Sequence, residues 1–383
     1  MVNILDKYVS LRLDPSRPIQ LLIAQTPCKL TYRDFKFLHS DPKDAEKIIL
    51  PVLEMLADGR EGLEEVDFTI FPEASVPIEL LDKVLGIIQG RFRPNTVTCF
   101  GLEHICLKEY LALLKTFQDD NPEAYRLVSQ HAMRDEARKP VNCAIIAVKD
   151  DSGRLSCFLE AKTHPFAGEE YFEDSRDLYR GRHIYLLRSE LIPFNFMTLI
   201  CLDYIYRDIA TSNIQKIIDR ANELYFVGRQ QLDLLIIIQC NPKPEHKAFW
   251  QVVNGFYGEF LAYTPGVRHS VTCFCNSSNE TELPDLMEPS EFGASSIIVS
   301  HHHKIKQLSL GEFSIDNFQG APVNRLRFGC STRLLHASVS PFHEPDPRTT
   351  RAPLKVLGIY KPSKAEGWYK VSLEEVMLGP QEA

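Results

Sequence analysis

The sequence contains no apolar run long enough to cross a membrane. Its most apolar stretch, Leu232 to Ile238, is interrupted by Asp233, and it is far shorter than the roughly 20 apolar residues that a spanning helix needs. The first residues, MVNILDKYVSLRLDPSRP, have no basic region that leads into a long apolar stretch, so no signal peptide is expected. These features predict a soluble, cytoplasmic protein without a membrane partner.

The sequence also lacks an excess of positive charge. Lysine and arginine together number 43, against 51 aspartates and glutamates, which gives a net charge of −8. This balance argues against nucleic acid or an anionic membrane as the main partner. Internal repeats and low-complexity segments are absent too. The 383 residues, of which 44% are apolar, are enough to build a sizeable core.

Signs of a cofactor or a metal are weak. The glycines in SGRL and NGFYG form no phosphate-binding pattern, so no nucleotide or other cofactor is expected. Cys273 and Cys275, followed by His301, His302 and His303, match no familiar zinc spacing, so core thiols and a surface turn are the better explanation and no metal is expected. The ten cysteines are expected to be free thiols in a chain without a secretion signal.

Short apolar runs alternate along the chain with longer amphipathic ones, which predicts an α/β protein with largely buried sheets. Helical patterns cover Asp44–Leu56, Pro77–Ile88, Ile209–Phe226 and Pro244–Tyr263. Pro51 lies inside the first of these patterns and predicts a kink or a break. The predicted strands are Leu21–Gln25, Asp67–Phe71, Thr96–Leu102, Cys143–Val148, Leu155–Ala161, Ile184–Leu187, Met197–Leu202, Leu234–Gln239, Val271–Cys275 and Ser296–Val299.

The pattern predicts one main domain, residues 1–340. A helical, charged segment at about 107–138 interrupts it and has the character of an insertion. The stretch SPFHEPDPRTTRAPLK begins at Ser340 and is rich in proline, arginine and charge, which is typical of a boundary. Residues 341–383 are therefore expected to form a C-terminal extension, which is a candidate contact for a further protein partner.

Three predicted strands end at residues that can carry chemistry. Cys201 ends the strand in LICLDY, Glu73 follows the strand in FTIFPEAS, and Lys162 follows the strand in CFLEAKTHPF. A thiol at such an end is expected to be exposed near unpaired N–H groups, which lowers its pKa. A nucleophilic cysteine also needs a base and a partner for the developing oxyanion. Taken singly, each residue has a plainer explanation: a packed thiol, a helix-capping glutamate and an exposed lysine.

Together, FPEAS, KTHPF and LICLDY resemble the carbon–nitrogen hydrolase (nitrilase) superfamily, whose members use glutamate, lysine and cysteine in this chain order. The resemblance extends from about residue 18 to about residue 340. It includes LLIAQTPCKLTYRD, TCFGLEH, NCAIIAVKDDSGRL, VTCFCNSSN and EFGASSIIVS. The chain departs from the family after the cysteine, where IYRD replaces the usual Phe-Pro-Glu. The segment at 107–138 is a second departure.

The resemblance implies a fold and a set of roles. The fold would be a four-layer α-β-β-α sandwich that forms a homodimer or a larger homo-oligomer. Glu73 would be the general base, Lys162 the cation beside the oxyanion, and Cys201 the nucleophile. Glu170 would be the further glutamate of the family, with its neighbour Glu169 as the alternative.

The expected chemistry is hydrolysis of an amide through a cysteine thioester. The backbone N–H of Leu202 would help to hold the oxyanion. Loops at strand ends often carry function, and the pocket wall is expected to include Phe166, Tyr204, Gln239 and Asn241.

Alternatives share much of this pattern. A nitrilase acting on a nitrile substrate and an N-acyltransferase would use the same three residues, and a binding or regulatory module could keep the fold without turnover. His164 or His183 could in principle serve Cys201 as a base, but their spacing does not favour it, and His164 is expected to be a structural neighbour of Lys162.

Overall fold

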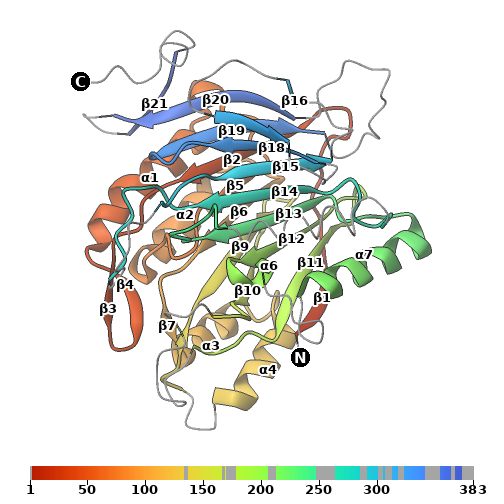
Figure 1. Ribbon diagram of the computed structural model, residues 1–383. Helices are drawn as coiled ribbons and strands as arrows, with labels where there is room; N and C mark the ends of the chain where they lie inside the picture. Colours follow the sequence, from red (N-terminus) through yellow and green to blue (C-terminus); the bar gives the residue numbers. More distant parts are fainter. Residues whose placement is uncertain are drawn as a thin grey trace.

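The computed structural model of the chain describes residues 2–132, 137–165, 169, 178–205, 213–246, 264–284, 291–300, 305–306, 313–317, 323–340, 354–363 and 367–372. Within these residues the protein is a mixed α/β structure with two large sheets (Figure 1). The predicted α/β class is confirmed.

The first large sheet has parallel strands at its centre, where β12, β13 and β14 lie side by side. The β13 sequence, LLIIIQ, is buried along its whole length, as expected for a strand that is covered on both faces. The strand order is β1 (Asn3–Val9), β11 (His183–Ser189), β12 (Asn195–Ile200), β13 (Leu234–Gln239), β14 (Val271–Asn276), β15 (Ser296–Ser300), β18 (Val323–Phe328) and β17 (Phe313–Asn317).

The second large sheet has parallel strands β2, β5 and β6 at its centre. The pairings outside them are antiparallel, apart from the parallel pair of β16 with β20. Its order is β10 (Leu155–Ala161), β9 (Cys143–Lys149), β6 (Thr96–Gly101), β5 (Phe68–Ile70), β2 (Ile19–Gln25), β19 (Arg333–Val339), β20 (Leu354–Pro362) and β16 (Ile305–Lys306), with β21 (Trp368–Lys370) paired to β20. Two small antiparallel sheets pair β3 (Leu30–Arg33) with β4 (Lys36–His39), which form a hairpin, and β7 (Ile105–Cys106) with β8 (Pro140–Val141).

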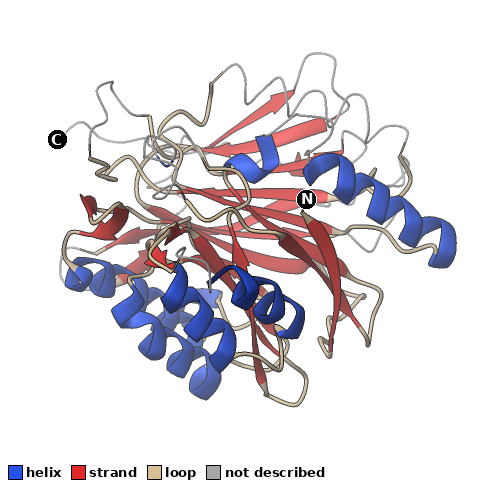
Figure 2. Ribbon diagram, turned by 90° about the horizontal axis from the view of Figure 1, so that it is seen from below, coloured by secondary structure: helices blue, strands red, loops and turns tan. Residues whose placement is uncertain are grey.

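The two large sheets pack face to face around one core. The ring of Phe68 in β5 packs against Phe196 in β12, with ring centroids 5.2 Å apart, and Cys275 in β14 lies against β2 and β5. The opposite face of β12–β14 is covered by helix α7 (Asn213–Gly228), which contributes Ile214, Ile217 and Leu224 to a separate apolar cluster. Helices α1 (Pro42–Ala57) and α2 (Leu81–Arg91) lie against the second sheet, away from α7 (Figure 2).

All ten predicted strands are present, with ends that differ by a few residues. The first predicted helix is α1, which begins after the N-cap Asp41 and continues through Pro51. The second is a short turn, η2 (Ile78–Leu80), followed by α2, and the third is α7. Of the fourth predicted helix, residues 247–263 lie outside the described residues. The single turn η1 (Arg60–Gly62) follows α1.

The predicted insertion contains two helices, α3 (Leu107–Thr116) and α4 (Pro122–Ala132). The antiparallel pairing of β7 with β8 joins the chain before α3 to the chain after α4, so this segment leaves and re-enters the fold at one place. The segment after residue 340 adds strand β20 to the second sheet, where Leu354 and Tyr360 are completely buried. This strand is therefore part of the core.

The ten cysteines are free thiols. Cys273 and Cys275 lie in the buried strand β14, whereas His301, His302 and His303 lie outside the described residues. Over the part of the chain that the structure describes, no helix is both long enough and apolar enough to cross a membrane.

Candidate active site

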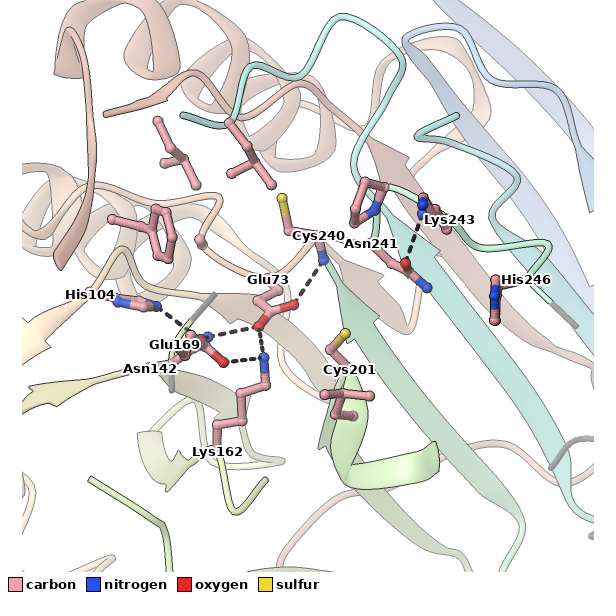
Figure 3. Close-up of a pocket in the computed structure, with 16 residues that line it drawn as sticks. Glu73, His104, Asn142, Lys162, Glu169, Cys201, Cys240, Asn241, Lys243 and His246 are labelled. Atoms are coloured by element: carbon pink, nitrogen blue, oxygen red, sulfur yellow. Dashed lines mark hydrogen bonds and ion pairs between the residues drawn. The ribbon is translucent and has the colours of Figure 1, made fainter. Parts of the chain in front are cut away.

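Three side chains from distant parts of the sequence line one pocket (Figure 3). Glu73 follows β5 after Phe71 and Pro72, Lys162 comes directly after β10, and Cys201 comes directly after β12. The pocket has a volume of about 470 Å³. The structure therefore brings a carboxylate, an ammonium group and a thiol from both sheets to a single cavity.

The carboxylate of Glu73 is held at both oxygens. Oε1 lies 2.7 Å from Lys162 Nζ and accepts a hydrogen bond of 2.7 Å from Asn142 Nδ2. Oε2 accepts a hydrogen bond of 2.8 Å from the backbone N–H of Cys240. Because Glu73 is buried, these contacts replace the water that a carboxylate otherwise binds, and they fix the direction in which it points.

The backbone at Glu73 is a tight turn that packs against Gly101. Ala74 has a φ of 54°, in the left-handed region, and the turn is pinned by backbone hydrogen bonds between Gly101 and both Pro72 and Val76. A Cβ on Gly101 would lie 2.4 Å from Ala74 N and 2.6 Å from Glu73 Cα. A glycine is therefore required at position 101 to hold the turn in this place.

Lys162 is a completely buried cation between two carboxylates. Its Nζ lies 2.7 Å from Glu73 Oε1 and 3.0 Å from Glu169 Oε2, and the exposure of its side chain is 0%. Burial opposes the charged form, but Glu169 and Glu73 outweigh it and raise the pKa of Lys162 well above its ordinary value. The ammonium group is thus a permanent positive charge beside the thiol.

Glu169, the alternative to Glu170, is the second carboxylate beside Lys162; Glu170 itself lies outside the described residues. Glu169 Oε1 accepts a hydrogen bond of 2.8 Å from Asn142 Nδ2 and lies 3.2 Å from His104 Nε2. Burial raises the pKa of Glu169, but Lys162 and His104 more than offset this and lower the pKa to about 2. Glu169 is therefore ionised at neutral pH.

Cys201 occupies a strained turn between β12 and the short helix α6 (Leu202–Ile205). Its φ is 47°, a left-handed value that costs a non-glycine residue about 1–2 kcal/mol. Its N–H donates a hydrogen bond of 2.9 Å to Ile238 O, and only 8% of the residue is exposed. Burial and the negative charge of Glu73 raise the pKa of Cys201 well above its ordinary value. The expectation of an exposed thiol with a lowered pKa was therefore wrong: this thiol is buried and protonated at neutral pH.

Asp203 ties the turn at Cys201 to the loop that follows Lys162, a role that the sequence did not indicate. Its Oδ1 accepts hydrogen bonds from the N–H and the hydroxyl of Thr163, at 2.9 and 2.7 Å, and from the N–H of His164, at 2.8 Å. All of these residues are buried. The carboxylate of Asp203 thus sets the position of the lysine relative to the cysteine.

Neither histidine that could have served as a base lines the pocket. The Nδ1 of His164 lies 2.7 Å from the Thr163 hydroxyl, so His164 is the structural neighbour of Lys162 that the sequence predicted. His183 is buried in β11, where its Nε2 lies 3.0 Å from Leu159 O and burial lowers its pKa to about 4.

Leu202 and Asn241, both predicted, line the pocket, whereas Phe166 lies outside the described residues. Tyr204 and Gln239 do not line it, and their predicted placement is corrected. Tyr204 packs edge to face against Phe274, with ring centroids 5.3 Å apart, in the cluster under α7. Gln239 is still within β13 and is 2% exposed.

Sequence reasoning missed several other residues of the pocket. His104 and Asn142 each adjoin a buried strand in the quoted stretches TCFGLEH and NCAIIAV, so a polar side chain at a strand end was the available signal. No comparable pattern marked the apolar wall, which comes from loops and a small hairpin. The remaining lining residues include Leu30, Phe37, Cys240, Pro242, Lys243, His246 and Leu283.

The donors in the described residues do not suit a metal, because no group of three or more His, Cys, Asp or Glu side chains there is arranged to hold one. No protein-family model matches the chain, and no curated protein matches it. What the chain does must therefore be argued from the geometry of the pocket.

Proposed function

We propose that the chain hydrolyses non-peptide carbon–nitrogen bonds and is an amidase that works through a thioester on Cys201. The observation that carries the proposal is the meeting of Cys201, Glu73, Lys162 and Glu169 at one pocket. A packed thiol alone would need no such surroundings. Burying an ammonium group between carboxylates is rarely justified by stability, and such perturbed groups in a cavity favour a catalytic site over a binding module.

The first step forms the thioester. Glu73 takes the proton of the Cys201 thiol while Sγ attacks the carbonyl carbon of the amide, and the C=O double bond becomes a single bond to an oxyanion. Lys162 and the backbone N–H of Leu202 stabilise this oxyanion. When the intermediate collapses, the C–N bond breaks and Glu73 returns its proton to the leaving nitrogen.

The second step releases the acid. Water loses a proton to Glu73 and attacks the thioester, the C–S bond breaks, and the sulfur regains a proton. Glu169 is a poor proton acceptor because its pKa is about 2, and a useful base has a pKa closer to the working pH. We therefore assign both proton transfers to Glu73, and we assign to Glu169 the task of keeping Lys162 charged and in place.

The fold and assembly implied by the resemblance belong to the same proposal. Face-to-face sheets, with α1 and α2 on one outer side and α7 on the other, support a four-layer α-β-β-α sandwich. The expected homodimer or larger homo-oligomer can be measured by light scattering coupled to size-exclusion chromatography.

The test is mass spectrometry of the intact protein after brief exposure to a panel of amides and nitriles. An acyl adduct confined to Cys201, together with release of the free acid, is the expected result. Cys201→Ala should abolish both, whereas Lys83→Gln, a change in an exposed ion pair, should not. Repeating the reaction with an added amine separates hydrolysis from acyl transfer. Unchanged turnover in Cys201→Ala, or no adduct from any compound, would rule the proposal out.

A further inference from the structure

Two thiols that the proposed mechanism does not use lie beside Glu73. Cys28 follows β2 and is completely buried, whereas Cys240 follows β13 and lines the pocket. Cys240 packs against a buried cluster formed by Cys28, Leu30 and Ala74, and a hydrogen bond joins the thiols of Cys28 and Cys240. The fold thus places two sulfurs from distant parts of the chain in contact.

Each of these cysteines also contacts Glu73. The thiol of Cys28 donates a hydrogen bond of 3.6 Å to the backbone carbonyl of Glu73, and the N–H of Cys240 donates one of 2.8 Å to Glu73 Oε2. The direction of the Glu73 carboxylate therefore depends on where Cys240 lies, and a movement of either cysteine acts on the turn that carries Glu73.

The chain beside both cysteines is anchored to one further segment. The N–H of Ser277 donates a hydrogen bond of 3.2 Å to Gln239 O, and the N–H of Ser278 donates one of 3.1 Å to Thr26 O. Both serines are completely buried. Because neighbouring residues of one segment hold the chain next to Cys28 and Cys240, the two cysteines are kept side by side.

The two thiols differ in their access to the pocket. Cys240 is partly exposed and lines the cavity, whereas Cys28 is covered. Figure 3 shows the sulfur of Cys240 directed away from Cys201. A small oxidant in the pocket can therefore reach Cys240, and the thiol that lies in contact with Cys240 is that of Cys28 and not that of the nucleophile.

We propose that Cys28 and Cys240 form a reversible disulfide, made by a hydroperoxide, that switches the site off by drawing the N–H of Cys240 away from Glu73. In the first step the Cys240 sulfur attacks a peroxide oxygen, the O–O bond breaks, and Cys240 becomes a sulfenic acid as one water leaves. In the second step the Cys28 sulfur attacks the Cys240 sulfur, the S–O bond breaks, and a second water leaves. The two thiols lose two electrons and two protons, which hydrogen peroxide takes up to become water.

The new bond requires a movement that disturbs the site. A disulfide is about 2.0 Å long, which is shorter than a hydrogen bond, so at least one of the two cysteines must shift. A shift of Cys240 withdraws its N–H from Glu73 Oε2, and a shift of Cys28 removes its hydrogen bond to the Glu73 carbonyl. A misplacement of about 1 Å can lower a rate about 100-fold. This effect on turnover rests on the proposed amidase function, whereas the disulfide itself does not.

The protonation of Cys240 sets the conditions under which the bond forms. The hydrogen bond with Cys28, together with burial, raises the pKa of Cys240 well above its ordinary value. Because the thiolate is the reactive form, formation of the disulfide should be slow at pH 7 and faster at pH 9.

The test treats the wild type with hydrogen peroxide, blocks the remaining thiols, and maps linked peptides by mass spectrometry without reduction. The expected result is a Cys28–Cys240 linkage that forms faster at pH 9 than at pH 7 and that dithiothreitol removes. Cys330→Ser, which removes an exposed thiol, is the matched control and should form the same linkage. A linkage of Cys240 to Cys201, or oxidation of Cys240 without any linkage, would overturn the proposal.

A second measurement compares the acylation of Cys201 before and after peroxide, each protein against its own reduced form. In the wild type the fraction of acylation lost should equal the linked fraction and should return with dithiothreitol. In Cys28→Ser the loss should be much smaller, and an equal loss would show that peroxide acts on Cys201 and would refute the switch. If no amide acylates the reduced protein, the amidase fails while the linkage is still decided by the peptide map. If the reduced protein is acylated and no linkage forms, only the disulfide is refuted.

Discussion

Replacing Lys162 with methionine tests how the buried charges support the site. Methionine keeps much of the volume of lysine but removes the ammonium group that lies 2.7 Å from Glu73 and 3.0 Å from Glu169. The two carboxylates would then share the amide of Asn142 with no cation between them. Breaking a buried ion pair by removing one partner costs about 3–5 kcal/mol.

A second line of reasoning gives a similar magnitude. The pKa of Glu169 lies at about 2 instead of the ordinary 4.5, and such a shift corresponds to about 3 kcal/mol of extra stability for the ionised form. Because the pKa is lower in the folded state, this stability is fully present above about pH 4.5 and is lost as the pH falls toward 2. The loss caused by Lys162→Met should therefore be largest at neutral pH and should shrink on acidification.

The measurement is urea unfolding of both proteins at pH 7 and pH 4, followed by circular dichroism. The double variant Lys162→Met, Glu169→Gln has one buried charge fewer, so it should recover part of the lost free energy of unfolding. Thioester formation should stay about 100-fold or more below wild type, since the cation for the oxyanion is still missing. A Lys83→Met control, at an exposed ion pair, should change stability by less than about 1 kcal/mol. A Lys162→Met protein as stable as wild type at pH 7 would refute the electrostatic account.

Three further predictions concern the backbone and the thiol. Gly101→Ala places a methyl group 2.4 Å from the turn that carries Glu73, the proposed general base, so acylation should fall about 100-fold. Gly86→Ala has open space around the new methyl group and should leave acylation unchanged. Equal activity of the two variants would contradict the packing. Asp203→Ala should lower kcat strongly. Asp203→Asn should keep kcat close to wild type, because the three hydrogen bonds from Thr163 and His164 all go to one oxygen, which asparagine retains. An equally low kcat in Asp203→Asn would mean that the charge of Asp203 matters, and not its hydrogen bonds. Burial and Glu73 raise the pKa of Cys201, so iodoacetamide should label Cys201 slowly at pH 7 and faster above pH 9. The exposed Cys330 should be labelled before Cys201 at pH 7. Rapid labelling of Cys201 at pH 7 would show that its thiol is ionised in the resting protein.

The meeting of Glu73, Lys162 and Cys201 at one pocket was predictable because each adjoins a strongly apolar strand. FTI before Glu73, LSCFLEA before Lys162 and NFMTLI before Cys201 are short runs whose burial the sequence makes plain. Strand ends gather at one edge of a sheet, so polar side chains there are easily brought together. The order of the motifs then gave each residue a role.

The second carboxylate could not be chosen in the same way. Glu169 and Glu170 are neighbours in a loop without an apolar period, so no local rule decides which one turns inward. The prediction that Tyr204 lines the pocket was wrong for a related reason. Helix α6 starts at Leu202, and within a helix each residue turns by about 100°, which carries Tyr204 to the α7 side of the sheet. If residues 202–205 had formed a loop, the side chain of Tyr204 would have pointed in a different direction.

The outer strands depend on partners far away in the chain. NILDKYV forms β1 because it pairs in parallel with β11, whose residues lie about 180 positions later. LKVLGIYKP forms β20 by pairing with β19 and β21, although the preceding stretch reads as a boundary. Strand propensity depends strongly on such context, so a single sequence reveals the central strands better than the edges.

The state of the thiol links the fold to the chemistry. Two buried carboxylates, those of Glu73 and Glu169, already surround the single cation of Lys162. A resting thiolate at Cys201 would be a further buried negative charge beside them, and burial and Glu73 raise the pKa of Cys201 accordingly. In the proposed mechanism the nucleophile therefore forms during the attack, as its proton moves onto Glu73 and the new charge develops on the oxyanion near Lys162. The positions of Gly101 and Asp203 matter for this reason, because such a proton transfer requires the base, the sulfur and the cation to be correctly placed relative to one another at the same time.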